Sequence, residues 1–345
     1  MNKKKDIRAL SKEQLRIFFV ENGNKAFRGN QVYEWLWQKS VHSFSDMTNI
    51  SKTIREMLEE NFVINHIKVD TMQRSKDGTV KNAVRLHDDL IVESVLIPTE
   101  TRTTACVSSQ VGCSLDCTFC ATARLKRMRN LHPDEIYDQV VAINKESLLY
   151  YNHKLSNIVF MGMGEPMMNY NNVIKAIEKI TSEEGLGISP RRITISTSGV
   201  PKMIKKMADD KIKCNLAISL HSAIEQVRTS IMPFNKIFPL TDLKDALLYW
   251  HEKTQRRVTY EYIVWKDIND KKKDIDALIK FCKYIPCKVN LIEYNPIDDD
   301  NFRQADKQVI NNYISNLELN NIIVNVRRSR GKDIDAACGQ LANKI

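Results

Sequence analysis

The sequence predicts an α/β protein whose body is a partial (β/α)6 TIM-like barrel, with an N-terminal helical accessory domain and a β-hairpin extension. The first observation is helical periodicity up to about residue 60. The second is two-residue alternation in the next segment, and the third is a long stretch in which strand-like and helix-like segments alternate. Repeated strand–helix units favour a parallel sheet with right-handed crossovers, and about six units make a partial barrel.

The N-terminal segment, residues 1–62, is expected to form a compact helical domain. Apolar positions at helical spacing predict helices over 10–22, 31–38 and 50–62. Gly23 and Gly29 are expected to mark turns between the helices, because glycine often interrupts regular structure.

Residues 63–98 are expected to form the β-hairpin extension. The runs TVKNAVRL and LIVESVLI alternate apolar and polar residues, and the polar turn 87–89 joins them. In the second run Glu93 shares a strand face with three aliphatic side chains, because strand side chains alternate between faces. An acid in that position suits a general base, and a paired acid at a sheet edge is the alternative.

The barrel itself is expected over residues 99–333, followed by a C-terminal segment, 334–345. Strands are predicted at 156–162, 191–197, 214–220, 257–265, 287–294 and 321–327. Helical patterns lie between them, such as 133–146, where Pro133 suits a first helical turn. Ligands bind at the carboxyl ends of the strands in such barrels, so polar residues at those ends indicate a lumen that holds a polar ligand.

The chain has 345 residues with 52 Lys and Arg against 42 Asp and Glu, which gives a formal net charge of +10 and a pI near 9.1. This excess of positive charge is expected of a protein that contacts a polyanion. Basic residues also gather near the motifs described below: Arg124, Lys126, Arg127, Arg129, Arg191, Arg192, Arg327, Arg328, Arg330 and Lys332. They suit phosphate contacts to a nucleic acid, and a solvated charged face is the alternative.

No apolar run reaches membrane-spanning length, and the stretch MNKKKDIRALSKEQ carries no apolar signal segment. We therefore expect a cytoplasmic protein without a membrane partner. Its eight cysteines are then not expected to form structural disulfides. Cys214, Cys282 and Cys287 lie in apolar surroundings and are expected to be packed in the core, which leaves Cys106 and Cys338 to be explained.

Cys113, Cys117 and Cys120 form the most informative motif of the chain, CSLDCTFC. Their intervals place three thiolates around one metal cluster, whereas an electron-transfer [4Fe–4S] cluster takes four. One iron would then be open to a small molecule. The alternative is a structural zinc site, which requires four ligands, and only His132 lies near in the sequence.

Further polar groups follow the expected strands. In GMGEP, residues 162–166, glycines allow the backbone to approach a ligand closely, and Glu165 can accept a hydrogen bond from an ammonium group. Three further expected strand ends carry Ser196, Ser219, His221 and Asn295. Each of these residues alone also suits an ordinary capped turn, and together they suit a polar ligand.

The three-Cys loop resembles the signature of radical S-adenosylmethionine (SAM) enzymes, and the chain as a whole resembles a narrower family. The motifs that carry this resemblance are CVSSQVGCSLDCTFCATA, FMGMGEPMMNY, SPRRITISTSG, ISLHSA, EYNP and DIDAACGQL. Together they are similar to the bacterial RlmN family, the dual-specificity adenine-C2 methyltransferases of 23S rRNA and tRNA. The related Cfr enzymes methylate adenine C8 and share the cysteines, and Pro166 favours RlmN. Cfr-like methylation and a zinc-stabilised RNA-binding module without catalysis remain the alternatives.

The resemblance implies two cofactors, a [4Fe–4S] cluster held by Cys113, Cys117 and Cys120, and SAM, of which two molecules are used per turnover. It implies SAM contacts at Gly164, Glu165, Ser196, Ser219, Leu220, His221 and Asn295. The cluster would donate the electron that cleaves SAM to an adenosyl radical. A radical is needed because adenine C2 is an electron-poor carbon that does not attack a methyl sulfonium.

The resemblance also implies roles for three residues outside the cluster loop. Cys338 takes a methyl group from one SAM, and a radical made from a second SAM converts this S-methyl group into a methylene radical that adds to C2. Cys106 then attacks the Cys338 sulfur, which releases the product and leaves a disulfide. Glu93 matches the proton acceptor for the C2 hydrogen. We expect residues 330–340 to form a mobile loop, because Cys338 has to face both SAM and the RNA base.

The implied partners are 23S rRNA and tRNA, together with an external electron donor and a thiol reductant that resets the disulfide. The target base is expected in single-stranded RNA, where a base edge can be reached. We expect the protein to be a monomer.

Overall fold

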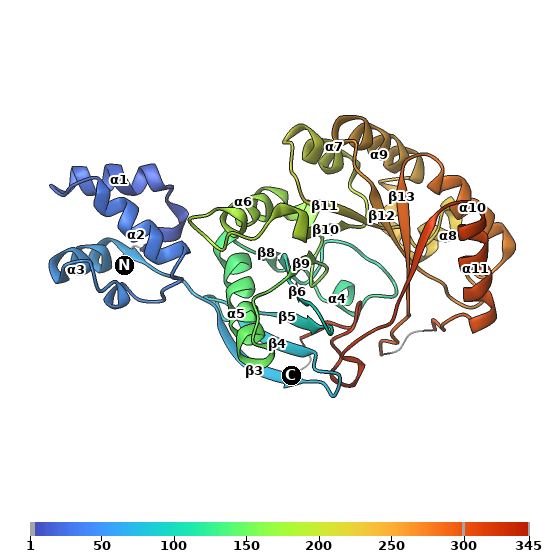
Figure 1. Ribbon diagram of the computed structural model, residues 1–345, viewed down its shortest axis with the longest axis horizontal. Helices are drawn as coiled ribbons and strands as arrows, with labels where there is room; N and C mark the ends of the chain where they lie inside the picture. The colour runs from blue at the N-terminus through green and yellow to red at the C-terminus, as the bar shows by residue number, and fades with distance from the viewer. Residues whose placement is uncertain (1–3, 299–300, 344–345) are drawn as a thin grey trace.

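The computed structural model describes residues 4–298 and 301–343, so residues 1–3 and 344–345 of the expected terminal segments lie outside the described chain. Its main feature is a ten-stranded mixed sheet in the order β14-β13-β12-β11-β10-β9-β6-β5-β4-β3 (Figure 1). Helices pack along the outer side of one half of this sheet, and a helical lobe lies at the N-terminal end (Figure 1). This lobe packs on the rest of the chain, with the ring centroids of Trp37 and Tyr137 5.1 Å apart.

The barrel half of the sheet is parallel throughout. Its strands are β6 (Thr103–Cys106), β9 (Asn157–Phe160), β10 (Ile193–Thr197), β11 (Asn215–Ser219), β12 (Val258–Ile263), β13 (Cys287–Ile292) and β14 (Ile323–Arg327). The helices that return the chain between them are α5 (Pro133–Tyr151), α6 (Tyr170–Thr181), α7 (Pro201–Asp209), α9 (Leu240–Thr254), α10 (Lys272–Cys282) and α11 (Lys307–Leu319). This arrangement confirms the predicted partial (β/α)6 barrel, and the strands predicted from the sequence are β9 to β14. The sequence did not predict β6, because TTAC is too short to show an alternation.

The predicted hairpin is present and belongs to the same sheet. β4 (Val80–Arg85) and β5 (Ile91–Pro98) pair antiparallel, and β5 also pairs antiparallel with β6. The sequence did not predict β3 (Lys68–Arg74), whose segment KVDTMQR has few apolar residues. The extension therefore continues the barrel sheet and places Glu93 close to the strand that ends in Cys106.

The N-terminal lobe contains α1 (Lys12–Glu21), α2 (Phe27–Trp37) and α3 (Lys52–Asn61), which confirm the three predicted helices. A short parallel pair, β1 (Lys5–Asp6) with β2 (Phe62–Val63), joins its two ends. The prediction for Gly29 was wrong, because this residue lies inside α2. A Cβ at Gly29 would lie 2.6 Å from the Arg16 backbone nitrogen, so glycine allows α1 and α2 to approach each other closely.

Side chains of the barrel strands alternate between a packed outer face and the lumen. On β12, Tyr260 and Tyr262 are buried against Phe281 and Tyr313, with ring centroids 5.6 and 5.7 Å apart, while Glu261 faces the lumen. Neighbouring strands contribute further polar groups to the lumen, namely Thr194, Ser196, Ser219, Asn290 and Asn325. The predicted polar lumen is therefore present.

Short elements complete the described chain. They are β7 (Gln110–Val111), α4 (Ala121–Arg124), β8 (Arg129–Asn130), α8 (Glu225–Ile231) and the 3-10 helices η1 (Ile7–Ala9), η2 (Phe44–Asp46), η3 (Pro166–Asn169), η4 (Pro190–Arg192), η5 (Pro233–Lys236) and η6 (Lys332–Ile334). Within the described residues, every helix is too short or too polar to cross a bilayer.

Candidate functional site

The three cysteines predicted to hold a cluster line one cavity at the carboxyl ends of the barrel strands. Their loop begins after β7 and runs into α4, where the Ala121 backbone N–H donates a 2.8 Å hydrogen bond to the Gly339 carbonyl. The cavity lining includes Cys113, Cys117, Cys120, Gly162, Gly164, Glu165, Ser196, Ser219, His221, Glu261 and Cys338. The fold thus collects most of the predicted site residues from segments that are far apart in the sequence.

The cysteine loop packs in an apolar cluster of its own. The buried members of this cluster are Leu115, Phe119, Ile231, Met232, Phe234, Ile263, Trp265 and Tyr294. Burial raises the pKa of the Cys113 thiol to about 12, and burial also raises the pKa values of Cys117 and Cys120. These thiols are therefore protonated at neutral pH without a metal, and metal binding must displace their protons.

This donor set fits an iron–sulfur cluster with one open ligand position. Thiolate is a soft ligand, and the apolar surroundings limit the access of solvent. Zinc fits less well, because a tetrahedral site with 2.3 Å Zn–S bonds holds its sulfurs about 3.8 Å apart. In residues 4–298 and 301–343, these cysteines belong to no group of three or more ligating atoms that all lie within 4.8 Å of one another.

Glu165 follows β9 and caps η3 at the wall of the cavity. Its Oε1 accepts a hydrogen bond from the Met167 backbone N–H at 3.0 Å, and its Oε2 accepts one from the Ser198 N–H at 2.8 Å. Burial raises the pKa of this carboxyl group, and the hydrogen bonds oppose the rise. A carboxyl group fixed in this way is placed to pair with an ammonium group of a ligand.

The glycines of GMGEP approach protein atoms closely. A Cβ at Gly162 would lie 2.8 Å from Ser108 Oγ, and a Cβ at Gly164 would lie 2.6 Å from Gln110 Cγ. Gly164 also has φ of +93°, in the region that favours glycine. These glycines allow the loop to pack onto the segment after β6, and the predicted close approach of their backbone to a ligand stays a prediction. Both glycines still line the cavity.

His221 follows β11 with φ of +56° and lines the cavity together with Ser196 and Ser219. Its Nδ1 accepts a 3.2 Å hydrogen bond from the Ile263 N–H, which places the ring proton on Nε2. Burial lowers the pKa of His221 to about 3, and the Arg228 guanidinium contributes to the decrease. The imidazole is therefore neutral at physiological pH and offers a donor.

Leu220 and Asn295 lie behind the cavity wall. The Leu220 side chain is fully buried in the core, its backbone N–H donates to the Glu261 carbonyl at 3.0 Å, and its carbonyl accepts from Arg228 Nε at 3.2 Å. Asn295 is also buried, and its Nδ2 donates to the Cys338 carbonyl at 3.3 Å. Among the described residues the Asn295 Oδ1 has no hydrogen-bond partner, which leaves a buried acceptor beside Cys338. Their contacts to SAM stay predictions.

A second cavity follows the barrel lumen and contains both Cys106 and Cys338. Cys106 ends β6 and is 6% exposed, whereas Cys338 is exposed. Burial raises the pKa of Cys106 to about 12, and the nearby Cys338 adds to the increase. Cys120 and Cys338 line both cavities, so the lumen lies next to the cavity of the cysteine loop.

The segment expected to be mobile, 330–340, is held by hydrogen bonds at several points. The Gly331 N–H donates to Asp77 Oδ2 at 2.9 Å, and Gln340 Nε2 donates to the Pro296 carbonyl at 3.1 Å. These bonds define one position of the segment, in which Cys338 faces the lumen. Its mobility stays a prediction.

Glu93 does not line either of these two cavities. Its Oε1 lies 3.1 Å from Lys81 Nζ, and its Oε2 accepts hydrogen bonds from the backbone N–H groups of Ala342 and Asn343 at 2.8 and 3.0 Å. In this structure Glu93 is a paired acid, which is the alternative that the sequence left open for this residue. The acid is not at a sheet edge, because β5 lies between β4 and β6. The role of proton acceptor stays a prediction, and it requires Glu93 to be released from these partners.

Two buried charged residues of the site were missed by sequence reasoning. Glu261 lines both cavities, with Asn290 Nδ2 donating to its Oε1 at 2.8 Å and Arg327 Nη1 at 3.6 Å from its Oε2. An acid in the middle of the strand RVTYEYIVW was a signal that could have identified it. Arg228 on α8 is fully buried. It was missed because the seven residues of this helix are too few to show a clear helical period.

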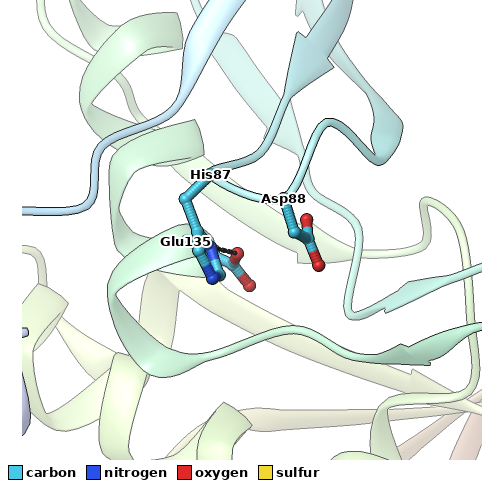
Figure 2. A group of neighbouring side chains, drawn as sticks. All are labelled: His87, Asp88 and Glu135. Carbon is cyan, nitrogen blue, oxygen red and sulfur yellow. Dashed lines mark hydrogen bonds and ion pairs between the residues drawn. The ribbon is translucent and has the colours of Figure 1, made fainter. Parts of the chain in front are cut away.

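His87, Asp88 and Glu135 form a compact group outside the two cavities (Figure 2). Their ligating atoms lie within 4.8 Å of one another, as in a metal site. Arg129 already occupies the group, because its guanidinium donates to Asp88 at 2.7 and 2.9 Å and to Glu135 at 2.8 Å. The group therefore ties the β4–β5 turn to α5. Arg129, predicted as a phosphate contact, is committed to these ion pairs.

Comparisons with known proteins agree with this fold and site. The model of the radical SAM superfamily matches residues 107–282. A solved structure, a radical SAM methyltransferase from Sphaerobacter thermophilus, is similar with a TM-score of 0.91 and 34% sequence identity, covering 98% of this chain and 99% of that chain. The barrel and its cysteine loop therefore define a radical SAM protein.

A narrower family is also shown. The model of the ribosomal RNA large subunit methyltransferase N-terminal domain matches residues 5–64. The probable dual-specificity RNA methyltransferase RlmN of Flavobacterium johnsoniae is 76% identical over 341 residues, which cover 99% of this chain and 98% of that protein. Its counterpart in Cytophaga hutchinsonii is 54% identical over 342 residues, 99% of this chain and 94% of that protein. The chain belongs to the RlmN family of radical SAM enzymes. Its cofactors are a [4Fe–4S] cluster and SAM.

Proposed function

We propose that the protein methylates C2 of a specific adenine in 23S rRNA, in the peptidyl transferase centre, and of an adenine in the anticodon loop of tRNA. The observation that carries the proposal is the position of Cys338. This residue lines the cavity of the three cluster cysteines and also the lumen that contains Cys106. A thiol between a radical-generating site and a second thiol is the arrangement that a covalent methyl carrier requires.

Cys113, Cys117 and Cys120 would hold the cluster. Glu165 would bind the amino group of SAM, and Ser196 and Ser219 would contact its polar groups. When bound, the cluster and SAM supply a carbon radical, which no side chain of the protein could supply. The apolar cluster around the cysteine loop excludes water from this chemistry.

Cys338 would carry the methyl group as a thioether. Loss of one hydrogen atom from this methyl group to the carbon radical, followed by loss from the base of the C2 proton and of one electron, which the oxidised cluster could take up, would leave the base joined to Cys338 through a methylene group. Attack of the Cys106 sulfur on the Cys338 sulfur forms the S–S bond and breaks the S–C bond. The electron pair of the broken bond stays with the carbon, which takes a proton and becomes the methyl group of the product. Cys106 first has to lose its own proton, which its raised pKa makes unfavourable at rest. An external thiol reductant then returns both cysteines to thiols.

Basic side chains along the second cavity support an RNA substrate. They are Arg102, Lys288, Arg327, Arg328 and Arg330. Together with the net charge of +10 they favour approach of a phosphate backbone. We further propose that the protein acts in the cytoplasm as a monomer and takes single electrons from an external donor.

Reconstitution under anaerobic conditions tests the proposal. The protein should show the visible absorption of an iron–sulfur cluster, and Cys117→Ala should lose it. Mass spectrometry of rRNA and tRNA after incubation with labelled SAM and reductant should find methyl label on adenine C2. Cys338→Ala should abolish this transfer while reductive cleavage of SAM persists, and Cys282→Ala, a core cysteine, should behave as the wild type.

Other results would identify the alternatives. Label on C8 would favour the Cfr-like reaction. Bound zinc without cluster absorption would favour the RNA-binding module. Methyl transfer by Cys338→Ala at the wild-type rate would exclude Cys338 as the carrier.

A further inference from the structure

Arg228 is a fully buried arginine beside the cluster cavity. Its Nε donates to the Leu220 carbonyl at 3.2 Å, and its Nη2 donates to the carbonyls of Ser219, at 3.3 Å, and of Ser198. Its Nη1 donates to the side-chain oxygen of Asn235. All of these acceptors are neutral. Burial lowers the pKa of Arg228 to about 10, which reflects the cost of holding a cation away from water.

A buried cation is normally stabilised by a carboxylate, and Arg228 forms no ion pair with one in residues 4–298 and 301–343. Glu225, on the same helix, raises the pKa of Arg228 through space, but its two oxygens accept hydrogen bonds from other donors and form no ion pair with the guanidinium. Arg8 provides the contrast, because this buried arginine donates to both oxygens of Asp138 and to Asp134. Arg228 therefore has its hydrogen bonds satisfied but lacks a direct counter-charge.

The segment that carries Arg228 is bonded to the cysteine loop. The backbone N–H and the Oγ1 of Thr118 both donate to the Ile231 carbonyl at 3.0 Å. The Phe234 N–H donates to Asp116 Oδ1 at 3.0 Å. These bonds fix α8 and η5 against the loop that would hold the cluster.

Arg228 lies beside the predicted cluster ligands. Ser198 and Ser219, whose carbonyls accept its hydrogen bonds, line the same cavity as Cys113, Cys117 and Cys120. Three thiolates give a bound [4Fe–4S] cluster a net negative charge, and reduction by one electron increases that charge. An anion of this kind is the partner that the cation lacks.

We infer that Arg228 is the counter-charge of the iron–sulfur cluster and raises its reduction potential. A fixed cation in a medium of low dielectric constant stabilises the more negative, reduced cluster relative to the oxidised one. The external donor can then deliver its electron more easily. The inference rests on the proposed function, in which Cys113, Cys117 and Cys120 hold the cluster.

Arg228 also connects the ends of β10 and β11 through its bonds to Ser198 and Ser219. A purely structural role would affect folding and SAM binding and would leave the potential of a correctly assembled cluster unchanged. The reduction potential is therefore the measurement that separates the two roles.

The test is a redox titration of the reconstituted protein without SAM, followed by electron paramagnetic resonance. Arg228→Gln removes the charge and Arg228→Lys keeps it. Arg256→Gln is the matched control, because Arg256 likewise donates to a carbonyl, Cys214 O at 2.6 Å, and to an amide oxygen, Asn215 Oδ1 at 3.0 Å, at the opposite end of β11.

We expect Arg228→Gln to lower the ratio of reduced to oxidised cluster at a fixed potential at least tenfold, which is a shift of about 59 mV for one electron. In Arg228→Lys the reduction potential should shift by less than half of that amount, and in Arg256→Gln it should not shift. If the Gln variant does not assemble a cluster, the test rests on Arg228→Lys alone. A tenfold lower ratio of reduced to oxidised cluster in Arg228→Lys, which keeps the charge, would overturn the inference.

Two further results would also overturn it. One is an unchanged potential in Arg228→Gln with normal cluster absorption. The other is a loss of SAM affinity without any change in potential, which would assign the guanidinium to the SAM carboxylate instead. Failure of the wild type to take up a cluster would contradict the proposed function, and the absorption spectrum shows that outcome before any titration.

Discussion

Lys81 and Glu93 form a buried ion pair, with Nζ and Oε1 3.1 Å apart and relative exposures of 4% and 1%. They lie on the paired strands β4 and β5. The other oxygen of Glu93 accepts hydrogen bonds from the backbone of Ala342 and Asn343. The pair therefore anchors the chain end that follows Cys338.

Replacing Lys81 with Met should destabilise the protein by about 3 kcal/mol, because it leaves the Glu93 carboxylate buried without its cation. Urea denaturation measures the effect. Lys68→Met, on the exposed face of β3, is the control and should change stability by less than about 0.5 kcal/mol. Equal stabilities of the two variants would mean that the pair contributes nothing.

Cys106→Ala should trap the enzyme on its RNA. Without the second thiol the thioether between Cys338 and the base cannot be resolved, so the reaction stops before a single turnover is complete. A denaturing gel should show a protein–RNA adduct, and mass spectrometry should locate it at Cys338. Cys214→Ala, which removes a buried thiol outside both cavities, should turn over normally. Normal turnover by Cys106→Ala would remove the resolving role.

His221 should make stability depend on pH between about 7.5 and 5.5. Its pKa is about 3 in the folded chain, against about 6.5 for an unfolded histidine. The unfolded chain therefore binds a proton in this range that the folded chain does not, and stability falls as the pH falls. The loss is about 1.4 kcal/mol.

Urea denaturation of the cluster-free protein at both pH values tests this, with His221→Asn as the comparison. Asparagine tolerates the positive φ and can accept from the Ile263 N–H, but it does not titrate. The variant should lose about 1.4 kcal/mol less than the wild type over this range. The pKa of His42 is also lowered, by burial and by His66, and this contribution is common to both proteins. An identical pH dependence in both proteins would contradict the assignment.

Gly29→Ala should separate α1 from α2. The added Cβ would lie 2.6 Å from the Arg16 backbone nitrogen, which cannot move without the helix, so a loss of about 2 to 3 kcal/mol is expected. Gly23→Ala is the comparison, because its Cβ would meet no atom within 4 Å and only the φ of +71° is unfavourable, at about 1 kcal/mol. Thermal melts should rank the variants in that order, and the reverse order would contradict the packing argument.

The fold could be predicted from the sequence wherever an element was long enough to show its period. The strands β9 to β14 and the three N-terminal helices were found for this reason. The short strand β6 and the polar strand β3 were missed because neither has a clear alternation, and both are held by pairing with their neighbours. Gly29 was placed in a turn because local sequence cannot show that another helix will cross at that residue.

The cysteine spacing and the motifs at the strand ends determined the class of chemistry, because ligand type and interval are local properties of the chain. Only the tertiary structure placed Cys338 between the cysteine loop and Cys106, paired Glu93 with Lys81, and buried Arg228 without a paired carboxylate among the described residues. These three relationships join residues from different elements. They depend on burial and on distance in space, which the order of residues along the chain does not contain.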